Sequence, residues 1–239
     1  MDPAHETGRV TVALKDGQPE YTIHEPAAWD FMELTDDWVR LAEQADAICF
    51  GSLAQRAPES RQTIQTLVAQ ARAGCVRVFD VNLRAPFYSS EVIQESLELA
   101  SVVKMNDAEV PMVLELLGFP QTETLRAGCG RLLQEFPELK LAAVTCGANG
   151  SLLVSRESWH QHPGVRVKVV DTIGAGDAFT AAMTHTLLQG TSLDTAGLAR
   201  LNEAGNRWGA WVASQPGAMP PLSEETKSQL SAFSRQLER

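Results

Sequence analysis

The chain has 239 residues, of which 44% are hydrophobic and 21% are charged, so it is long enough for one large α/β domain with its own core. Its formal net charge of -10 argues against a general nucleic-acid-binding protein, which would need a basic surface. No apolar run reaches the roughly 18 residues of a membrane span, and the polar N-terminal residues lack the apolar part of a signal peptide. We therefore expect a cytoplasmic protein that binds neither nucleic acid nor membrane.

The first predicted element is an antiparallel hairpin. Residues 9–14 alternate apolar and polar side chains, an Asp-Gly pair at 16–17 supplies the turn, and residues 21–23 form the returning strand. This two-faced ribbon differs from the buried strands that follow it. We therefore expect residues 1–30 to form a small β lid hairpin, and residues 31–239 to form a single α/β nucleotide-binding and catalytic core.

From about residue 35 the pattern changes to helices that alternate with continuous apolar strands. Helices are predicted at 36–44, 58–73, 90–100, 107–117, 122–136, 175–188, 194–212 and 223–237. Strands are predicted at 47–50, 76–81, 101–105, 141–145, 151–155 and 166–170. This alternation is typical of a mostly parallel sheet covered on both faces, so the predicted fold class is α/β with three layers, α/β/α.

The four cysteines give no sign of a metal site or a redox motif. Cys49, Cys75, Cys129 and Cys146 contain no Cys-x-x-Cys spacing, and no histidine lies at metal-ligand spacing from them. Most of them fall in apolar, strand-like runs. We expect buried, reduced thiols.

The segment with the clearest chemistry is 171–179, DTIGAGDAF, which follows a β-branched run and opens a predicted helix. Its glycines let the backbone turn sharply and approach a ligand closely. The first amides of a helix are unpaired and, with the helix dipole, form an anion site. A carboxylate beside such a site is useful if Asp177 accepts a proton from a hydroxyl. The amides of Gly174, Ala175 and Gly176 would then stabilise the phosphoryl group being transferred.

This segment alone leaves other functions open. Glycine-rich turns are common, and Asp favours helix N-termini for structural reasons. A dinucleotide-binding motif would need Gly-x-Gly-x-x-Gly near the chain start, whereas this segment lies late and carries Phe179. The Gly-Lys-Ser/Thr of a P-loop is absent from it.

The full string resembles the second signature of the ribokinase-like (PfkB) carbohydrate kinases, and other segments follow in that family's order. Residues 79–84, FDVNLR, look like the Asp-x-Asn-x-Arg strand end of fructokinase-type members. Residues 104–109, KMNDAE, resemble the Asn-x-x-Glu motif, and residues 145–150, TCGANG, resemble the nucleotide turn Thr-x-Gly-x-x-Gly. Asn206 followed by Ala213 resembles the C-terminal adenine and cation region. The resemblance covers nearly the whole chain.

The resemblance implies ATP-dependent phosphorylation of a small sugar, with Asp177 as the base. It places the following residues at ATP: Asn106, Thr145, Gly147, Gly150 and Asn206. Asn82 and Arg84, beyond the C-terminal end of a strand, would contact phosphate or sugar. Glu109 would hold Mg²⁺ through water, because this ion keeps much of its hydration.

Three further expectations come from the resemblance. A monovalent cation such as K⁺ would be held by Asp171 and by the carbonyls of Ile173 and Ala213, and a backbone ligand tolerates Ile where the family usually has Thr. Fructokinase-like members often carry a segment like the one around Trp29 near the sugar, although a core or clasp tryptophan is an equal alternative. Relatives often dimerise through the lid, so the hairpin allows a homodimer.

The chain also departs from the family. Full-length relatives carry an N-terminal part before the hairpin, with a first strand, a sugar-anchoring Asp and a Gly-Gly-x-x-x-Asn motif, and these have no counterpart here. We expect an exposed sheet edge and weaker positioning of the sugar. The favoured substrate is fructose or a related ketose, with 2-keto-3-deoxygluconate or a nucleoside left open. The alternative is a truncated, non-catalytic nucleotide-binding or interaction protein of the same fold.

Overall fold

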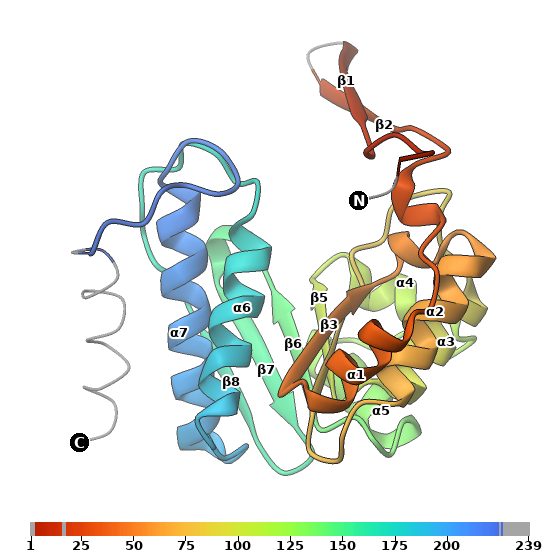
Figure 1. Ribbon diagram of the computed structural model, residues 1–239. Coiled ribbons are helices and arrows are strands. Elements are labelled where there is room, and N and C mark those ends of the chain that lie inside the picture. The colour runs from red at the N-terminus through yellow and green to blue at the C-terminus, as the bar shows by residue number, and fades with distance from the viewer. Residues whose placement is uncertain (1–2, 16–17, 225, 227–239) are drawn as a thin grey trace.

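The N-terminal hairpin projects away from the body of the molecule (Figure 1). The computed structural model describes residues 3–15, 18–224 and 226. Strands β1 (Val10–Lys15) and β2 (Gln18–Ile23) pair in antiparallel fashion. The predicted hairpin is confirmed, although its turn at 16–17 lies outside the described residues.

The body is built on a six-stranded sheet in the order β3-β4-β5-β6-β7-β8. Its strands are β3 (Ala47–Gly51), β4 (Val76–Asp80), β5 (Val102–Asn106), β6 (Leu141–Thr145), β7 (Ser151–Ser155) and β8 (Trp159–His162). The strands from β3 to β6 are parallel to one another, whereas β7 and β8 are antiparallel to their neighbours. The predicted α/β fold with a mostly parallel sheet and a small antiparallel hairpin is confirmed.

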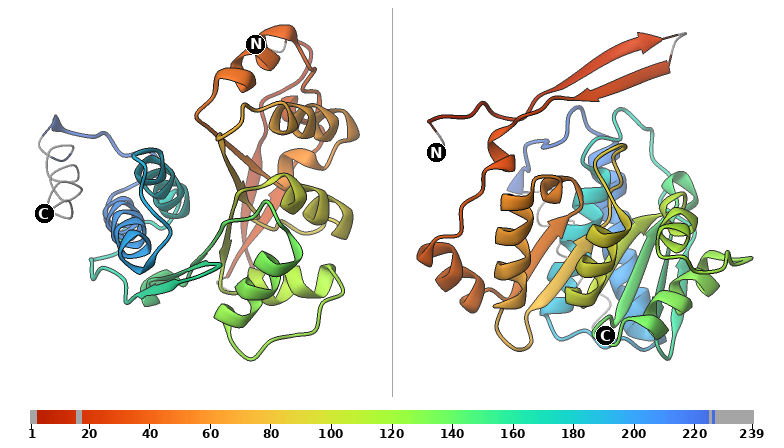
Figure 2. Two further views of the ribbon diagram at one scale, coloured as in Figure 1. Left: turned by 90° about the horizontal axis from the view of Figure 1, so that it is seen from below. Right: turned by 90° about the vertical axis from the view of Figure 1, so that its right-hand side faces the viewer.

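Helices cover both faces of this sheet. They are α1 (Asp36–Gln44), α2 (Pro58–Ala69), α3 (Ser90–Leu99), α4 (Glu109–Leu116), α5 (Leu125–Glu135), α6 (Ala175–Leu188) and α7 (Thr195–Ala213). Helices α6 and α7 lie on one face and α2 to α5 on the other (Figure 2). Side chains of Thr35, Ser89, Thr124 and Asp194 accept an amide of the helix that follows each of them, as expected for N-cap residues.

The two faces of the sheet have separate apolar cores. Successive residues of β4 illustrate this, because Val78 packs with the α6–α7 side and Phe79 with the α2–α5 side. Both are 0% exposed. Burial on both faces explains why these strands are continuous apolar runs with no polar alternation.

The last strand of the sheet was predicted at the wrong place. Residues 166–170 form no strand, and Val169 and Val170 are 58% and 56% exposed. Instead β8 pairs with β7, with Ser151 opposite His162. The end of the 166–170 run is held by a helix end and not by a strand, because the amides of Val170 and Asp171 donate to the carbonyl of Ala213, the last residue of α7. The helix predicted at 223–237 falls largely outside the described residues.

The expectation of buried cysteines is wrong for Cys49. Cys75 and Cys129 are buried and Cys146 is partly buried, but Cys49 is exposed. Strand β3 lies at the edge of the sheet with β4 as its neighbour in the sheet order, and α6 stands away from it in the view of Figure 1.

Within the described ranges, no helix is long and apolar enough to cross a membrane.

Candidate active site

Helix α6 begins at a glycine that no other residue could replace without strain. Gly174 is its N-cap, with φ at 80°. A Cβ added there would lie 2.5 Å from the carbonyl oxygen of Ala218. The left-handed backbone and the close approach of a second chain segment both require glycine. The motif therefore fixes the direction in which α6 leaves its loop.

The first turn of α6 presents unpaired amides beside a carboxylate. Ala175 donates its amide to the carbonyl of Thr172 at 3.2 Å, whereas the amides of Gly176 and Asp177 have no hydrogen-bond partner within the described residues. Asp177 itself is exposed. Unpaired amides at a helix N-terminus can bind an anion, so a proton acceptor and an anion site lie in the same turn.

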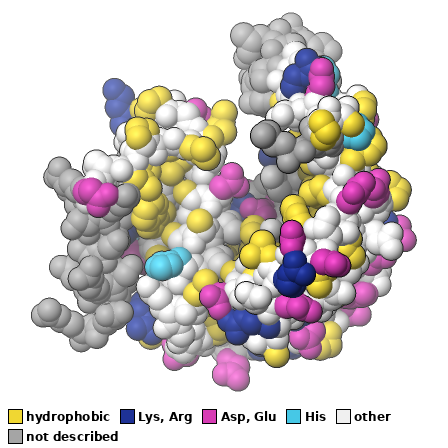
Figure 3. All heavy atoms as spheres, in the orientation of Figure 1, with side chains coloured by type: hydrophobic (Ala, Val, Ile, Leu, Met, Phe, Trp, Pro, Cys, Tyr) yellow, Lys and Arg dark blue, Asp and Glu magenta, His cyan; other side chains and the backbone are white. Residues whose placement is uncertain are grey.

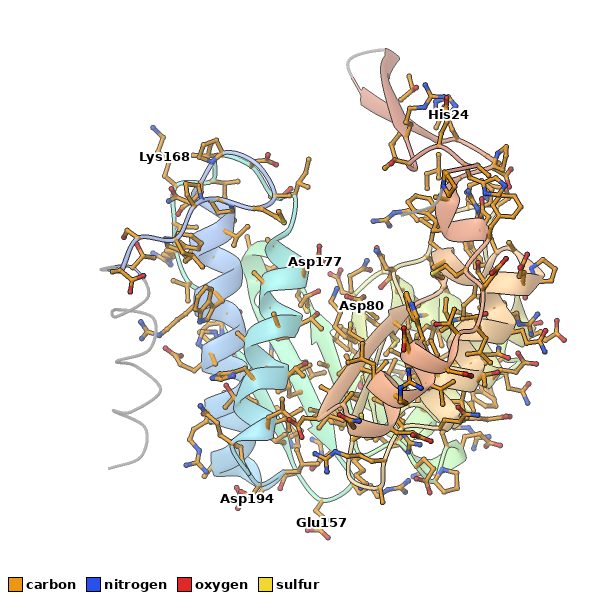
Figure 4. All side chains as sticks on the ribbon, in the orientation of Figure 1. His24, Asp80, Glu157, Lys168, Asp177 and Asp194 are labelled. Carbon is orange, nitrogen blue, oxygen red and sulfur yellow. The ribbon has the colours of Figure 1, made fainter. Side chains whose placement is uncertain are left out.

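Asp177 opens into a small cavity of about 280 Å³ at the carboxyl ends of β3 and β4. The cavity is lined by Trp29, Cys49, Phe50, Gly51, Ser52, Leu53, Ala54, Asp80, Asn82 and Asp177. Asp177 and Asp80 face this space from different elements (Figure 4). In the space-filling view, acidic side chains gather in the hollow between the α6 side and the side that carries the hairpin (Figure 3).

Sequence reasoning assigned no role to two charged residues at and beside this cavity, Asp80 and Lys104, although both lie in segments that it quoted, 79–84 and 104–109. Asp80 ends β4, and its carboxylate accepts from the ammonium of Lys104, with 3.2 Å between Oδ1 and Nζ. Burial raises the pKa of Asp80, and the positive charge of Lys104 opposes that rise. The signal was present in the sequence, because a lysine in the middle of an apolar strand needs a partner.

Glu109 ties two neighbouring strand ends together. Its Oε1 accepts the amide of Leu83 and its Oε2 accepts the amide of Asn106, each at 2.8 Å. The side chain of Asn106 in turn accepts the amide of Glu109 at 2.9 Å. With Glu109 only 4% exposed, its carboxylate acts as a clamp between the ends of β4 and β5, and its remaining lone pairs are what a metal could use.

The clamped segment carries the residues that were predicted to contact phosphate or sugar. Asn82 has φ at 39°, a left-handed conformation that asparagine tolerates better than most residues. It lines the cavity, and Arg84 is exposed two residues later. Arg84 donates to the carbonyl of Leu83 at 3.0 Å. The structure thus brings Asn82 to Asp177, whereas Arg84 is not among the lining residues.

The residues predicted to bind ATP lie around the β6–β7 hairpin. Gly147 and Gly150 have positive φ values, and a Cβ on Gly150 would lie 2.0 Å from the carbonyl oxygen of His162. Thr145 ends β6 and donates to Met105 at 3.4 Å. Asn206 is 9% exposed and donates to Ser151 at 2.6 Å. Asn206 therefore fastens α7 to the start of β7.

The predicted cation ligands lie where the loop before α6 meets the end of α7. Asp171 accepts the amides of Ile173, at 2.9 Å, and of Gly217, at 3.2 Å. The carbonyl of Ala213 accepts the amides of Val170, at 2.9 Å, and of Asp171, at 3.3 Å. These bonds join the loop before α6 to the end of α7. Within the described part of the chain, no group of three His, Cys, Asp or Glu side chains is arranged as a metal site.

Trp29 is held at the cavity by a buried ion pair. Arg56 donates to both carboxylate oxygens of Asp30 at 2.7 Å, and the pKa of Asp30 is lowered, chiefly by its hydrogen bond with Arg56. The guanidinium lies 5.4 Å from the ring of Trp29 and 4.8 Å from that of Phe87. Trp29 can therefore be both a packed tryptophan of the clasp and a residue that contacts the sugar.

Comparison with known proteins identifies the family. The model of the pfkB family of carbohydrate kinases matches residues 1–225. The chain belongs to this family. Among pfkB relatives, fructokinase of Escherichia coli is 31% identical over 247 residues, a match that covers 96% of this chain and 75% of that protein.

Solved structures of pfkB kinases share the fold. A sugar kinase of Pyrococcus horikoshii in complex with ATP aligns with a TM-score of 0.78 and 28% identity, over 99% of this chain and 74% of that one. Fructokinase of Vibrio cholerae, bound to fructose, ADP and calcium ion, aligns with a TM-score of 0.75 and 27% identity, over 97% and 74%. In the sequence match, this chain spans 66% of the length of the Pyrococcus horikoshii kinase.

Proposed function

We propose that this chain transfers the γ-phosphoryl group of ATP to a hydroxyl of a small sugar, with Asp177 as the general base. The observation that carries this proposal is the first turn of α6, where unpaired amides and the Asp177 carboxylate meet a cavity of about 280 Å³. A space of this size suits one small polyol. Membership of the pfkB family supports the same reaction.

In this mechanism Asp177 accepts the proton of the attacking hydroxyl, which makes the acceptor oxygen a better nucleophile. The amides of Gly176 and Asp177 donate to the oxygens of the transferred group. The anion hole predicted from the sequence also includes Gly174 and Ala175, but the amide of Ala175 is already engaged by the carbonyl of Thr172. Because both functions come from one helical turn, their separation is set by the backbone and needs no rearrangement at the moment of reaction. Phosphoryl transfer depends largely on such positioning.

Mg²⁺ would be held near Glu109, whose oxygens suit a hard cation. Both carboxylate oxygens already accept backbone amides, so this residue would contact the ion through water, and the phosphates of ATP would supply direct ligands. Bound there, Mg²⁺ would neutralise charge on the phosphates. K⁺ remains a proposal for the loop of Asp171, Ile173 and Ala213.

The nucleotide would lie along Asn106, Thr145, Gly147 and Gly150. The strand ends that carry them are adjacent in the sheet, since Asn106 pairs with Thr145. Asn206 would not contact the nucleotide directly. It would hold α7 against Ser151 at the start of β7. Its donors are engaged within the protein, so we assign it a supporting role at the adenine end of the site.

A ketose such as fructose is the favoured acceptor because fructokinases recur among the relatives. A riboside stays open, since aminoimidazole riboside kinase of Salmonella typhimurium is 32% identical over 174 residues. 2-Keto-3-deoxygluconate is a third candidate. Trp29, Asn82 and Asp80 line the cavity, and they would contact the ring and hydroxyls of the acceptor.

The test is a coupled ADP-release assay with a panel of fructose, 2-keto-3-deoxygluconate and a nucleoside. Asp177→Asn should lower turnover by about 10²- to 10⁴-fold, because it removes a positioned base, while leaving the melting temperature unchanged at this exposed position. Asp36→Asn is the matched control, since it makes the same change in the first turn of α1, outside the cavity. We expect it to keep full turnover.

The competing proposal is a non-catalytic nucleotide-binding or interaction protein. If the folded protein releases ADP at the same rate with and without every sugar, the kinase proposal fails and this alternative stands.

Dimerisation through β1 and β2 is a further proposal, to be tested by light scattering.

A further inference from the structure

A buried lysine lies directly beneath the proposed catalytic turn. Lys104, in the middle of β5, is 8% exposed. It stands opposite Asp80 in the register of β4 and β5, and the side chains of the pair are 10% and 13% exposed. Both side chains therefore leave the sheet on the same face, toward α6.

Two contacts join this pair to α6. A Cβ added to Gly176 would lie 3.2 Å from the Nζ atom of Lys104, so the ammonium lies against the helix backbone one residue before Asp177. Thr180, one turn later, approaches Asp80 with 3.5 Å between its hydroxyl and Oδ2, and it donates to the carbonyl of Gly176 at 2.9 Å. Lys104, Asp80 and Thr180 thus connect strands β4 and β5 to the first turn of α6.

The positive charge of Lys104 is unusual beneath the N-terminal turn of a helix. A cation beneath the N-terminal turn opposes the helix dipole, which favours anions there. A buried ion pair is also weak evidence for stability, since apolar replacements of both partners are often neutral or stabilising. Helix stability alone therefore does not explain a lysine here.

The surroundings of the ammonium are acidic. Asp80 experiences the charges of Glu109 and Asp177 as well as that of Lys104. Cys49 of β3 lines the same cavity as Asp80 and Asp177. Lys104 is the cation in this set of charges, and it lies between the carboxylate that lines the cavity and the backbone that carries Asp177.

We propose that Lys104 is a positioning residue for the catalytic turn. Its ammonium holds Asp80 at the wall of the cavity and supports the Gly176 backbone from below, which places Asp177 and the free amides. The catalytic consequence rests on the proposed kinase function. The placement of the turn does not depend on it, so the two can be tested separately.

The first experiment compares Lys104→Met with the double variant Lys104→Met/Asp80→Asn. The single variant leaves an unpaired buried carboxylate and should lower both the melting temperature and kcat. The double variant should regain most of the melting temperature. Its kcat should stay about 100-fold below that of Asp80→Asn alone, which already lacks the carboxylate contact with the acceptor, and the KM for ATP should change little. Recovery of kcat together with the melting temperature would overturn the proposal, because the pair would then have a structural role alone.

The second experiment needs no turnover. Hydrogen–deuterium exchange is measured on peptides covering residues 172–183. Both Lys104→Met and the double variant should speed exchange at the start of α6 by about tenfold relative to peptides of α5. Lys140→Met, the same change at an exposed position, should leave it unaltered. Unchanged exchange in the double variant would refute the positioning role, whether or not the wild type phosphorylates a sugar.

Discussion

Replacing Glu109 by Gln should separate its structural role from a role as a metal ligand. Its two oxygens accept the amides of Leu83 and Asn106, each at 2.8 Å, in a site where the residue is 4% exposed. Glutamine keeps one oxygen that can accept an amide. Its other terminal atom becomes an NH₂ group, a donor that would face the second backbone amide, which is also a donor. Hydrogen bonds to charged groups contribute about 1.5–3 kcal/mol each, and a buried unpaired amide adds to the loss, so the expected destabilisation is about 2–4 kcal/mol.

For a chain of this length, that loss corresponds to a fall in melting temperature of roughly 5–15 °C. The assay is thermal unfolding followed by circular dichroism, in EDTA and again with Mg²⁺. Glu115→Gln, an exposed carboxylate on the same helix, is the control and should melt like the wild type. A melting temperature of Glu109→Gln that equals the wild type in EDTA would refute the clamp, since a pure metal-ligand role predicts no change without metal.

Two more predictions test the packing of α6 and the accessibility of the cavity. A Cβ on Gly205 would lie 2.6 Å from the ring of Phe179, so Gly205→Ala should cost about 1–3 kcal/mol in urea unfolding. Gly130→Ala, in open space on α5, should instead stabilise slightly, and equal effects would contradict the argument. Cys49 is exposed, but it lines the cavity, where desolvation and the negative charges of Asp80 and Asp177 raise the pKa of its thiol to about 11. Its alkylation should therefore speed up about tenfold per pH unit from pH 7 to 10 and slow when the acceptor sugar is bound. Cys129, whose pKa burial raises to about 12, should stay unmodified; a rate for Cys49 that is independent of pH would refute this.

Local patterns predicted most of the fold because each element carries its own signals. Helix starts follow capping residues such as Thr35 and Ser89, and doubly buried strands read as continuous apolar runs. The exceptions are at the sheet edges. β8 is a polar strand that exists because β7 offers a free edge, and Cys49 is exposed because of where β3 lies in the sheet order. Neither position is encoded within the strand itself.

The candidate site also has features that the local sequence predicted and features that only the folded chain shows. The segment from Asp171 to Asp177 predicted a helix start with free amides and a carboxylate, because glycine conformation and helix-end polarity are local properties. It could not reveal that Lys104 lies beneath Gly176, since that contact joins a strand to a helix far along the chain.

Sequence alone therefore determined the chemistry of the first turn of α6, and the tertiary structure decided what surrounds that turn. The clamp of Glu109 on Leu83 and the pair of Asp80 with Lys104 each cross more than 20 residues of sequence. Such bonds form only when packing of the apolar faces brings strand ends together. Hydrophobic burial is non-directional, so it determines which surfaces meet, and the polar partners that meet there are visible only in the folded chain.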